Sequence, residues 1–223
     1  MPRKVSVQWL GRTEYGAALD LQRRAAEKCA RGEGETLFLL EHEPVFTLGR
    51  NARRQDVIWS QERCAAEGIR IYETDRGGMV TYHGPGQLVG YPILDLSPDR
   101  CDVKRYVTDL EESILLALAD LGVRAGRSSD PQRVTSVWVG NDKIAAIGVH
   151  LSRWVTTHGF ALNVTTNLGD FSGIVPCGIL DGGVTSIERV LGRSVPLEQV
   201  ARAYLPRFAE VFGRELVTFV EPS

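Results

Sequence analysis

The sequence lacks several features that would place it in a specialised class of protein. No apolar run in its 223 residues approaches the length of a membrane span, and its short basic start is followed by no apolar core or small-residue cleavage site. We therefore expect no membrane association and no secretory signal. The formal net charge of −2 provides no overall basic field, so we expect no nucleic-acid partner. No repeat or linker divides the chain, and we expect one domain over residues 1–223.

Common cofactor motifs are also missing. The chain has no G-x-x-x-x-G-K-[ST] and no G-x-G-x-x-G after a strand pattern, which excludes nucleotide phosphate cradles of those types. No histidine pair has metal-ligand spacing on one helix. Cys29, Cys64, Cys101 and Cys177 are far apart and form no C-x-x-C, which argues against a disulfide framework or a zinc site. Free thiols suit a reducing compartment, so we expect a cytoplasmic protein.

The apolar pattern predicts an α+β domain. Apolar residues make up 43% of the chain and charged residues 24%, as in ordinary globular proteins. Helical periodicity or capping signals predict helices over residues 15–30, 60–67, 103–121, 185–192 and 196–212. Strand patterns cover residues 4–10, 36–41, 45–48, 70–74, 134–139, 143–150, 154–164 and 215–220. Residues 124–133 are polar and turn-rich, which predicts a surface loop. Strands and helices do not alternate strictly, which favours a single domain with a mixed β-sheet flanked by helices.

The stretch R-G-G-M-V-T-Y-H-G-P-G-Q-L-V-G-Y, residues 76–91, is the most distinctive part of the chain. Its many glycines indicate positive φ angles or close approach of the backbone to another group. β-Forming residues on both sides of Gly84-Pro85-Gly86 predict two strands joined by a tight turn, with backbone N–H groups open to a ligand. An ordinary glycine-rich hairpin is the alternative interpretation.

Cys177 and Lys143 are candidates for chemistry. Cys177 lies in P-C-G, within a loop rather than on an amphipathic stripe, where it could act as an exposed thiol nucleophile. Lys143 opens a strand of small residues, and an ammonium near a thiol favours the thiolate. A buried loop cysteine and a plain surface lysine are the alternatives. Cys29 and Cys64 fall on predicted helices, which indicates packing roles.

Three histidines and a basic cluster have open roles. His83 and His158 each precede a glycine, and either could be a general base or a fixed hydrogen-bond partner, so a Cys–His pair is possible. His42 could be a site residue or have a surface or capping role. The segment containing Arg50, Arg53 and Arg54 could meet an acidic partner or form a solvated loop.

The stretch 76–91 closely resembles the signature of the lipoyl(octanoyl) transferase family. The segments K-I-A-A-I-G-V at 143–149, H-G-F-A-L-N at 158–163 and G-I-V-P-C-G-I at 173–179 resemble the other motifs of that family, in the same order. The resemblance covers residues 37–186, and Met79 departs from the polar or charged residue expected at its position. It implies a fold like that of biotin and lipoate protein ligases.

The resemblance also implies roles for particular residues. Cys177 would be the nucleophile that carries the acyl group as a thioester, and Lys143 would lower its pKa. The segments that match the substrate-binding segments of the family comprise Arg76, Gly77, Gly78, Met79, Val80, Thr81, Tyr82, His83, Ala146, Ile147, Gly148, Gly159, Phe160 and Ala161.

By the same resemblance, the reaction moves an octanoyl group from octanoyl-acyl carrier protein to a lysine of a lipoyl domain. The expected acceptors are lipoyl domains of 2-oxoacid dehydrogenases and the glycine cleavage H protein. A thioester is already activated, so no ATP and no other cofactor is implied. Lys143 is our candidate base toward the acceptor lysine, with His83 as a second candidate. Because such partners are usually acidic, the arginines at positions 50, 53, 54 and 76 are candidates for docking them.

Other functions are compatible with the same residues. An ATP-dependent lipoate- or biotin-protein ligase would not need Cys177. A non-catalytic module that binds acyl groups or carrier proteins would tolerate loss of Cys177 and Lys143. A Cys–His hydrolase would pass the acyl group to water and release free octanoate.

Overall fold

The computed structural model describes residues 2–128, 135–175 and 183–220. Its strands are β1 (Arg3–Thr13), β2 (Glu35–His42), β3 (Val45–Leu48), β4 (Arg70–Glu73), β5 (Val80–His83), β6 (Gln87–Ile93), β7 (Gly126–Arg127), β8 (Ser136–Val139), β9 (Asp142–Ser152), β10 (Val155–Asn163) and β11 (Arg214–Val220). Its helices are α1 (Tyr15–Ala30), α2 (Gln61–Ala66), α3 (Val103–Asp120), α4 (Ile187–Leu191) and α5 (Leu197–Phe212), with the 3-10 helices η1 (Arg54–Asp56) and η3 (Leu168–Gly173).

The main sheet is mixed. Over the described ranges it has eight strands in the order β11-β1-β2-β6-β10-β9-β8-β7. β1 runs parallel to both of its neighbours, β11 and β2. The remaining neighbours, from β2–β6 to β8–β7, pair antiparallel. A mixed sheet flanked by helices confirms the predicted α+β class.

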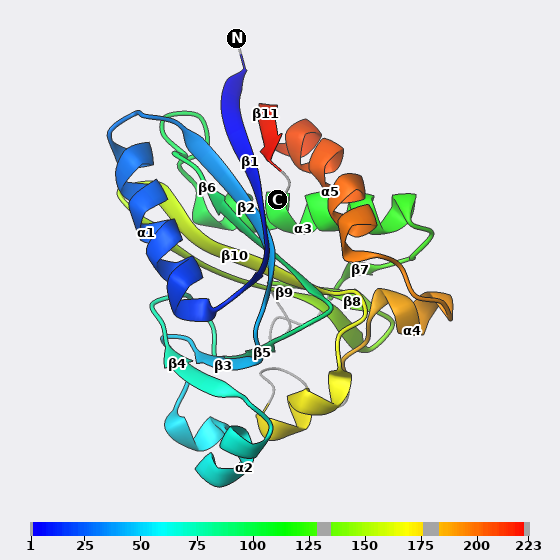
Figure 1. Ribbon diagram of the computed structural model, residues 1–223. Coiled ribbons are helices and arrows are strands. Elements are labelled where there is room, and N and C mark those ends of the chain that lie inside the picture. The colour runs from blue at the N-terminus through cyan, green and yellow to red at the C-terminus, as the bar shows by residue number, and fades with distance from the viewer. Residues whose placement is uncertain (1, 129–134, 176–182, 221–223) are drawn as a thin grey trace.

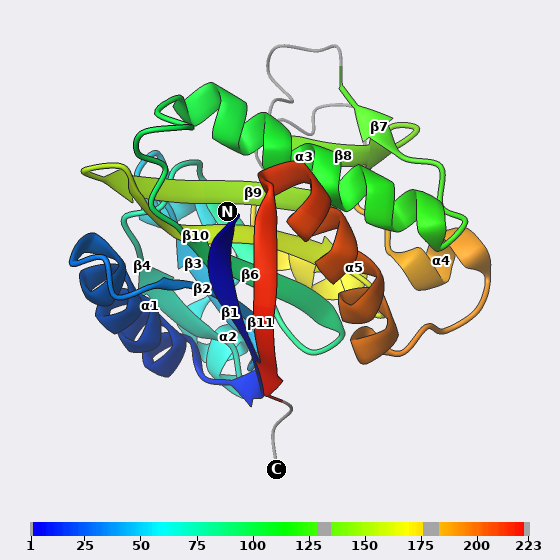
Figure 2. The same cartoon turned by 90° about the horizontal axis from the view of Figure 1, so that it is seen from above.

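Helices cover both faces of this sheet. Figures 1 and 2 show α3 and α5 on one side and α1 on the other. The side chains of β2 alternate accordingly: Leu37 and Leu39 belong to the core under α3 and α5, whereas Phe38 and Leu40 belong to the core under α1. Because successive residues of a strand point to opposite faces, a strand buried on both sides needs an unbroken apolar run. This explains the sequence T-L-F-L-L in β2.

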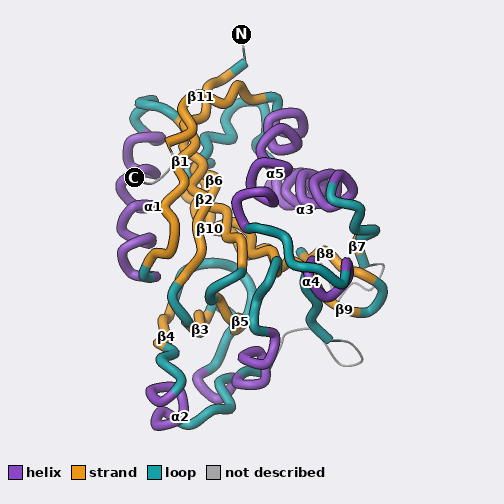
Figure 3. Tube along the Cα trace, turned by 45° about the vertical axis from the view of Figure 1, so that its right-hand side comes forward, coloured by secondary structure: helices purple, strands orange, loops and turns teal. Residues whose placement is uncertain are grey.

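A smaller sheet lies beside the main one, next to α2 (Figures 1 and 3). Its strand order is β4-β3-β5 within the described part of the chain. β5 pairs antiparallel with β3, while β6 pairs with β2 and β10 of the main sheet. The predicted turn at Gly84-Pro85-Gly86 does join two strands, but the hairpin interpretation is wrong because the strands do not pair with each other. The turn instead passes the chain from one sheet to the other.

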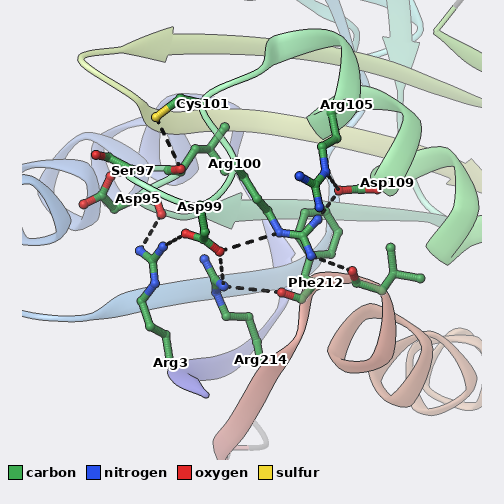
Figure 4. A network of polar contacts seen from close by, with 12 residues as sticks. Arg3, Asp95, Ser97, Asp99, Arg100, Cys101, Arg105, Asp109, Phe212 and Arg214 are labelled. Carbon is green, nitrogen blue, oxygen red and sulfur yellow. Dashed lines mark hydrogen bonds and ion pairs between the residues drawn. The ribbon is translucent and has the colours of Figure 1, made fainter. Parts of the chain in front are cut away.

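A network of ion pairs links β1 and β11, the strands near the two ends of the chain, to β2 and to α3. Arg214 of β11 places Nε 2.7 Å from Oε2 of Glu35 on β2, and both side chains are buried. Arg3 of β1 contacts Glu35 and Asp99, and Arg214 also approaches Asp99 at 3.4 Å. Figure 4 shows this network continuing to Arg100, which contacts Asp109 of α3. Charged groups therefore hold together strands that are remote in sequence.

The remaining sequence predictions agree with the structure in most places. The helix predicted at residues 15–30 is α1, and the Ser60 side chain caps α2 by accepting a hydrogen bond from the N–H of Arg63. The surface loop predicted at 124–133 is wrong in part, since Gly126 and Arg127 pair with β8 as a short strand. Among the described helices, none is long and apolar enough to cross a membrane.

Candidate active site

A cavity of about 120 Å³ lies where the small sheet meets β9 and β10 of the main sheet. Its walls come from the segment leading into β5, from β5 itself, and from β9 and β10, which are far apart in sequence. Ile174 and Val184 also line it, and these residues flank the segment 176–182, which the structure does not describe. The cavity is lined largely by apolar atoms with a few polar side chains, an arrangement typical of small-molecule sites.

Most residues predicted to bind substrate lie on this cavity. The lining includes Arg76, Gly77, Gly78, Met79, Val80, Thr81, His83, Ala146, Ile147, Gly148, Gly159, Phe160 and Ala161, together with Lys143. Tyr82 is the predicted residue that is not part of the lining. Its buried ring packs against Phe46 and Phe171, because alternation along β5 turns it away from Thr81 and His83. A contact with substrate remains a prediction for the lining residues.

Arg76 anchors the glycine-rich segment to the small sheet. Its guanidinium donates hydrogen bonds to the carbonyl and hydroxyl oxygens of Thr47 at 2.8 and 2.9 Å, and to the carbonyl of Gly77 at 2.9 Å. Only 7% of Arg76 is exposed. The prediction that Arg76 docks an acidic partner at the surface is therefore wrong. Arg50, Arg53 and Arg54 are exposed, and Arg50 donates to Nδ1 of His150.

Glycines allow the segment to approach β9 closely. A Cβ atom on Gly148 would lie 3.0 Å from the carbonyl oxygen of Gly77, and the N–H of Gly77 donates to the carbonyl of Val149. The stretch was predicted to expose backbone N–H groups to a ligand, but that of Gly77 is used within the protein. This contact places the segment 76–78 over β9.

Two buried histidines are in contact, and one of them, His83, lines the cavity. His83 is stacked on Tyr15 with ring centroids 6.2 Å apart, and its ring centroid lies 5.7 Å from that of His42. Burial lowers the pKa of His83 well below its usual value, and it lowers the pKa of His42 to about 4. His42 is fully buried and bonded to the carbonyl of Thr13 and the hydroxyl of Tyr91. The surface role considered for His42 is therefore wrong, and both imidazoles are neutral at pH 7.

His158 is held in a constrained position on β10. Its φ angle is 58°, and its main-chain N–H donates a hydrogen bond to Oε1 of Gln22. Its ring Nε2 lies 2.8 Å from Oδ1 of Asp75. Burial lowers its pKa, although Asp75 opposes that shift. The side chain thus has a fixed hydrogen-bond partner, which is one of the two roles considered for it.

Gln87 and Asn163 are cavity residues that we did not predict. Gln87 bonds to Nδ1 of His83 at 2.7 Å and to Asn163 at 2.9 Å, and Asn163 bonds to the carbonyl of Thr185 at 3.0 Å. All four residues are buried. The signal in the sequence was a polar side chain at the end of an apolar strand pattern, in Q-L-V-G-Y and in F-A-L-N, since buried polar groups require partners.

Lys143 lies near the start of β9, next to residues 183–185, which follow the segment 176–182. Its N–H donates to the carbonyl of Gly183, its carbonyl accepts from Thr185, and its Nζ lies 5.2 Å from the centre of the Trp138 ring. Cys177 lies outside the described residues, so its relation to Lys143 stays a prediction. The chain that flanks Cys177 on its C-terminal side is nevertheless fixed to the backbone of Lys143.

The other cysteines differ from a reactive thiol. Cys29 and Cys64 are buried, which confirms their predicted packing roles, and burial raises the pKa of both, that of Cys29 to about 12. Cys101 is exposed and lies away from the cavity lining. In the part of the chain that the structure describes, no group of three or more His, Cys, Asp or Glu side chains could hold a metal ion.

Comparisons with known proteins give consistent results. Residues 14–209 match the model of the lipoyl protein ligase A/B catalytic domain. An octanoyltransferase of Myxococcus xanthus is 50% identical over 98% of this chain, which spans 62% of that protein's length. An octanoyltransferase of Caldicellulosiruptor bescii is 48% identical, with 95% of this chain and 93% of that protein covered.

The fold comparison agrees with the predicted architecture. A bipartite lipoate protein ligase from Thermoplasma acidophilum, whose structure was determined in a study that included its E2 lipoyl domain, superposes with a TM-score of 0.75. The match covers 97% of this chain and 88% of the other at 18% identity. The likeness at this identity concerns the fold alone, and it confirms the prediction of a lipoate-ligase-like architecture.

Proposed function

The chain belongs to the lipoyl protein ligase A/B catalytic domain family, and we infer that it is an acyltransferase that moves octanoyl groups in protein lipoylation, as its octanoyltransferase relatives do. In this proposal, residues 1–223 form one catalytic domain. The donor is octanoyl-acyl carrier protein, and the acceptor is a specific lysine of a lipoyl domain. The lipoyl domains of 2-oxoacid dehydrogenases and the glycine cleavage H protein are the acceptors of this class, and the reaction takes place in the cytoplasm.

One observation supports this function most strongly. Three motif segments that are distant in sequence line a single, mainly apolar cavity, and Lys143 and both flanks of the Cys177 segment lie on the same cavity. Such a cavity suits an acyl chain, because burying each methylene contributes about 0.8 kcal/mol. The octanoyl chain therefore binds here, with its thioester directed toward Cys177.

The first half of the reaction forms an acyl-enzyme. The Cys177 thiolate attacks the carbonyl carbon of the thioester, and the bond from that carbon to the sulfur of the carrier's arm breaks. The Lys143 ammonium gives its proton to the departing thiolate. Since a thioester is already activated, this step needs no ATP.

The second half transfers the acyl group to nitrogen. The neutral amine of the acceptor lysine attacks the Cys177 thioester, the Cys177 thiolate departs, and a proton of the attacking nitrogen passes to Lys143. An unperturbed lysine has a pKa of about 10.4, so the site must stabilise the neutral amine. The resting pair of thiolate and ammonium is restored.

Intact mass spectrometry tests this proposal. The protein mixed with octanoyl-acyl carrier protein, without ATP, is expected to gain one octanoyl group that survives denaturation and is released by hydroxylamine. Cys177→Ser should show no hydroxylamine-labile adduct, and Lys143→Met should form the adduct far more slowly. Adding a lipoyl domain should move the mass from the enzyme to the domain.

The fold likeness to a lipoate protein ligase makes an ATP-dependent ligase the second candidate. That function predicts acylation of the lipoyl domain only with ATP and free octanoic acid, and unchanged activity in Cys177→Ser. A binding module would form no acylated product in either assay. Release of octanoate without lipoyl-domain acylation would identify a hydrolase.

A further inference from the structure

Hydrogen bonds in the cavity wall link His83, Gln87 and Asn163. Main-chain carbonyls that bond to Gln87 and Asn163 determine which group donates and which accepts in each of these bonds. The side-chain nitrogen of Asn163 lies 3.0 Å from the carbonyl oxygen of Thr185. Because a carbonyl only accepts, the amide NH₂ of Asn163 must face it, and Oδ1 faces Gln87. Gln87 in turn lies 2.9 Å from that Oδ1 and 3.3 Å from the carbonyl of Tyr82. Both are acceptors, so Gln87 presents its NH₂ to them and its Oε1 to His83.

This direction determines where His83 carries its proton. Gln87 Oε1 lies 2.7 Å from Nδ1 of His83 and can only accept, so Nδ1 carries the hydrogen. A neutral imidazole with hydrogen on Nδ1 has a lone pair on Nε2. His83 is therefore an acceptor at Nε2, which excludes it as a hydrogen-bond donor to a developing oxyanion.

The neighbours of His83 keep Nε2 available. Tyr15 stacks on one face of the ring, and His42 is occupied by Thr13 and Tyr91. Within the described residues no hydrogen bond engages Nε2 of His83, and the side chain lines the cavity. The structure thus holds one buried acceptor directed by a relay of side chains, beside the proposed acyl site.

We propose that Gln87 and Asn163 are positioning residues that hold His83 in its Nδ1–H tautomer, so that Nε2 accepts a hydrogen bond from the amine of the incoming lysine. This inference rests on the proposed acyl transfer and specifies how its acceptor is oriented. A neutral amine has two N–H bonds and one lone pair, and an acceptor on the enzyme turns the lone pair toward the thioester. The opposite tautomer would donate to that lone pair and block attack. His83 takes no proton in this step, because the proton of the attacking nitrogen passes to Lys143.

Nitrogen-15 NMR of the full chain tests the tautomer without any substrate. The protein has four histidines, so ¹⁵N-histidine labelling gives few signals, and His83→Gln assigns those of His83. At pH 8 the wild type should show a protonated Nδ1 and an unprotonated Nε2 at His83. Gln87→Met removes the acceptor, and Asn163→Leu frees Gln87 to rotate without touching His83, so both should increase the Nε2–H form.

Thr156→Val is the matched control. Thr156 is buried on β10, the strand of Asn163, and its hydroxyl bonds the backbone at Pro92 and Leu94 rather than the relay. It should lower stability without changing the His83 tautomer. If the wild type carries hydrogen on Nε2, or if Asn163→Leu has no more effect on the tautomer than Thr156→Val, the relay is refuted.

Single-turnover kinetics test the role in transfer. In Gln87→Met, transfer from isolated octanoyl-enzyme to a lipoyl domain should slow by roughly 10- to 100-fold, the loss expected from misplacing a reacting group. Acyl-enzyme formation should keep its wild-type rate. Slowing of formation alone would mean that Nε2 serves an N–H of the carrier's arm, and equal slowing of both steps would mean a purely structural role; either outcome overturns the proposal. If the wild type forms no acyl-enzyme, the proposed function fails, whereas the tautomer measurement is unaffected.

Discussion

Ala146 of β9 lines the cavity with a small side chain. Ala146→Val adds two carbon atoms to a space of about 120 Å³, so a long acyl chain should lose contact before a short one. The ratio of kcat/KM for octanoyl over hexanoyl donors should fall about 4-fold for each methylene excluded, at about 0.8 kcal/mol per methylene.

The measurement is competition between the two acyl carrier proteins. Ala119→Val, on the exposed side of α3, serves as the control and should leave the ratio unchanged. An equal loss for both chain lengths would show that position 146 does not contact the acyl chain.

His42 makes stability depend on pH below neutrality. Its pKa is about 4 in the folded protein against an ordinary value of 6.5, because burial disfavours the charged form. Below pH 6.5 the unfolded state binds more protons than the folded state, so the free energy of unfolding falls as pH falls from 6.5 toward 4. The full loss attributable to His42 is about 3 kcal/mol.

Urea unfolding at several pH values measures this effect. His42→Gln can still donate to Thr13 and accept from Tyr91, but it has no titrating ring. Its free energy of unfolding should fall less than that of the wild type between pH 6.5 and 4. Parallel curves for the two proteins would contradict the assignment. Burial also lowers the pKa values of His83 and His158. These two residues make the free energy of unfolding depend on pH in the wild type and in His42→Gln alike.

Single residues were predictable where the chemistry is local. The motif residues Arg76 and His83 were placed at the cavity from the sequence, because their segments resemble a known family. The relay through Gln87 and Asn163 was not, since the positions are 76 residues apart and only pairing of β6 with β10 brings them together. The buried state of His42 was missed for the same reason, because Thr13 and Tyr91 are distant in sequence.

At the scale of elements, β6 and β10 meet at a glycine that makes room for an aromatic ring. A Cβ atom on Gly90 would lie 2.1 Å from Cε1 of Phe160, whose ring packs against Tyr204 with centroids 4.7 Å apart. Gly90→Ala should therefore displace Phe160 and lower the free energy of unfolding by about 1–3 kcal/mol, the usual effect of overpacking.

A double-mutant cycle tests the cause. Phe160→Leu should reduce the effect of Gly90→Ala, so that the double variant is more stable than the sum of the single effects predicts. Additive effects in urea unfolding would mean that the alanine acts through backbone preference and not through the ring.

The helices were predicted better than the sheets. Periodicity and caps lie within one segment, so α1 and α5 were located within a residue of their ends. Strand pairing is a property of distant segments, and the sequence did not indicate that β5 and β6 belong to different sheets. Nor did it show that Gly126 and Arg127 form an edge strand, because that depends on pairing with β8, their neighbour within the described ranges.

At the scale of the molecule, Arg214 and Glu35 connect β11 to β2 across β1. Arg214→Met leaves the buried Glu35 carboxylate with one ion-pair partner among the described residues, the partly exposed Arg3, and with a hydrogen bond from the N–H of Asp95. We expect a loss of about 3 kcal/mol in the free energy of unfolding, as for other broken buried pairs.

Arg207→Met provides the comparison. Arg207 pairs with Asp120 at a more exposed position, and its loss should change stability by less than about 1 kcal/mol. Chemical unfolding of both variants at pH 7 measures the difference. Equal effects would show that the Arg214 pair contributes no more than a surface contact.

The parallel pairing of β11 with β1 has a consequence for biosynthesis. β1 contains residues 3–13, yet one of its two neighbours comes from residues 214–220. While the ribosome makes the intervening chain, β1 has an unpaired edge that can recruit strands from other nascent chains. The native sheet closes only after more than 200 further residues have been translated, so chaperones that shield strand edges should associate with β1 during most of translation.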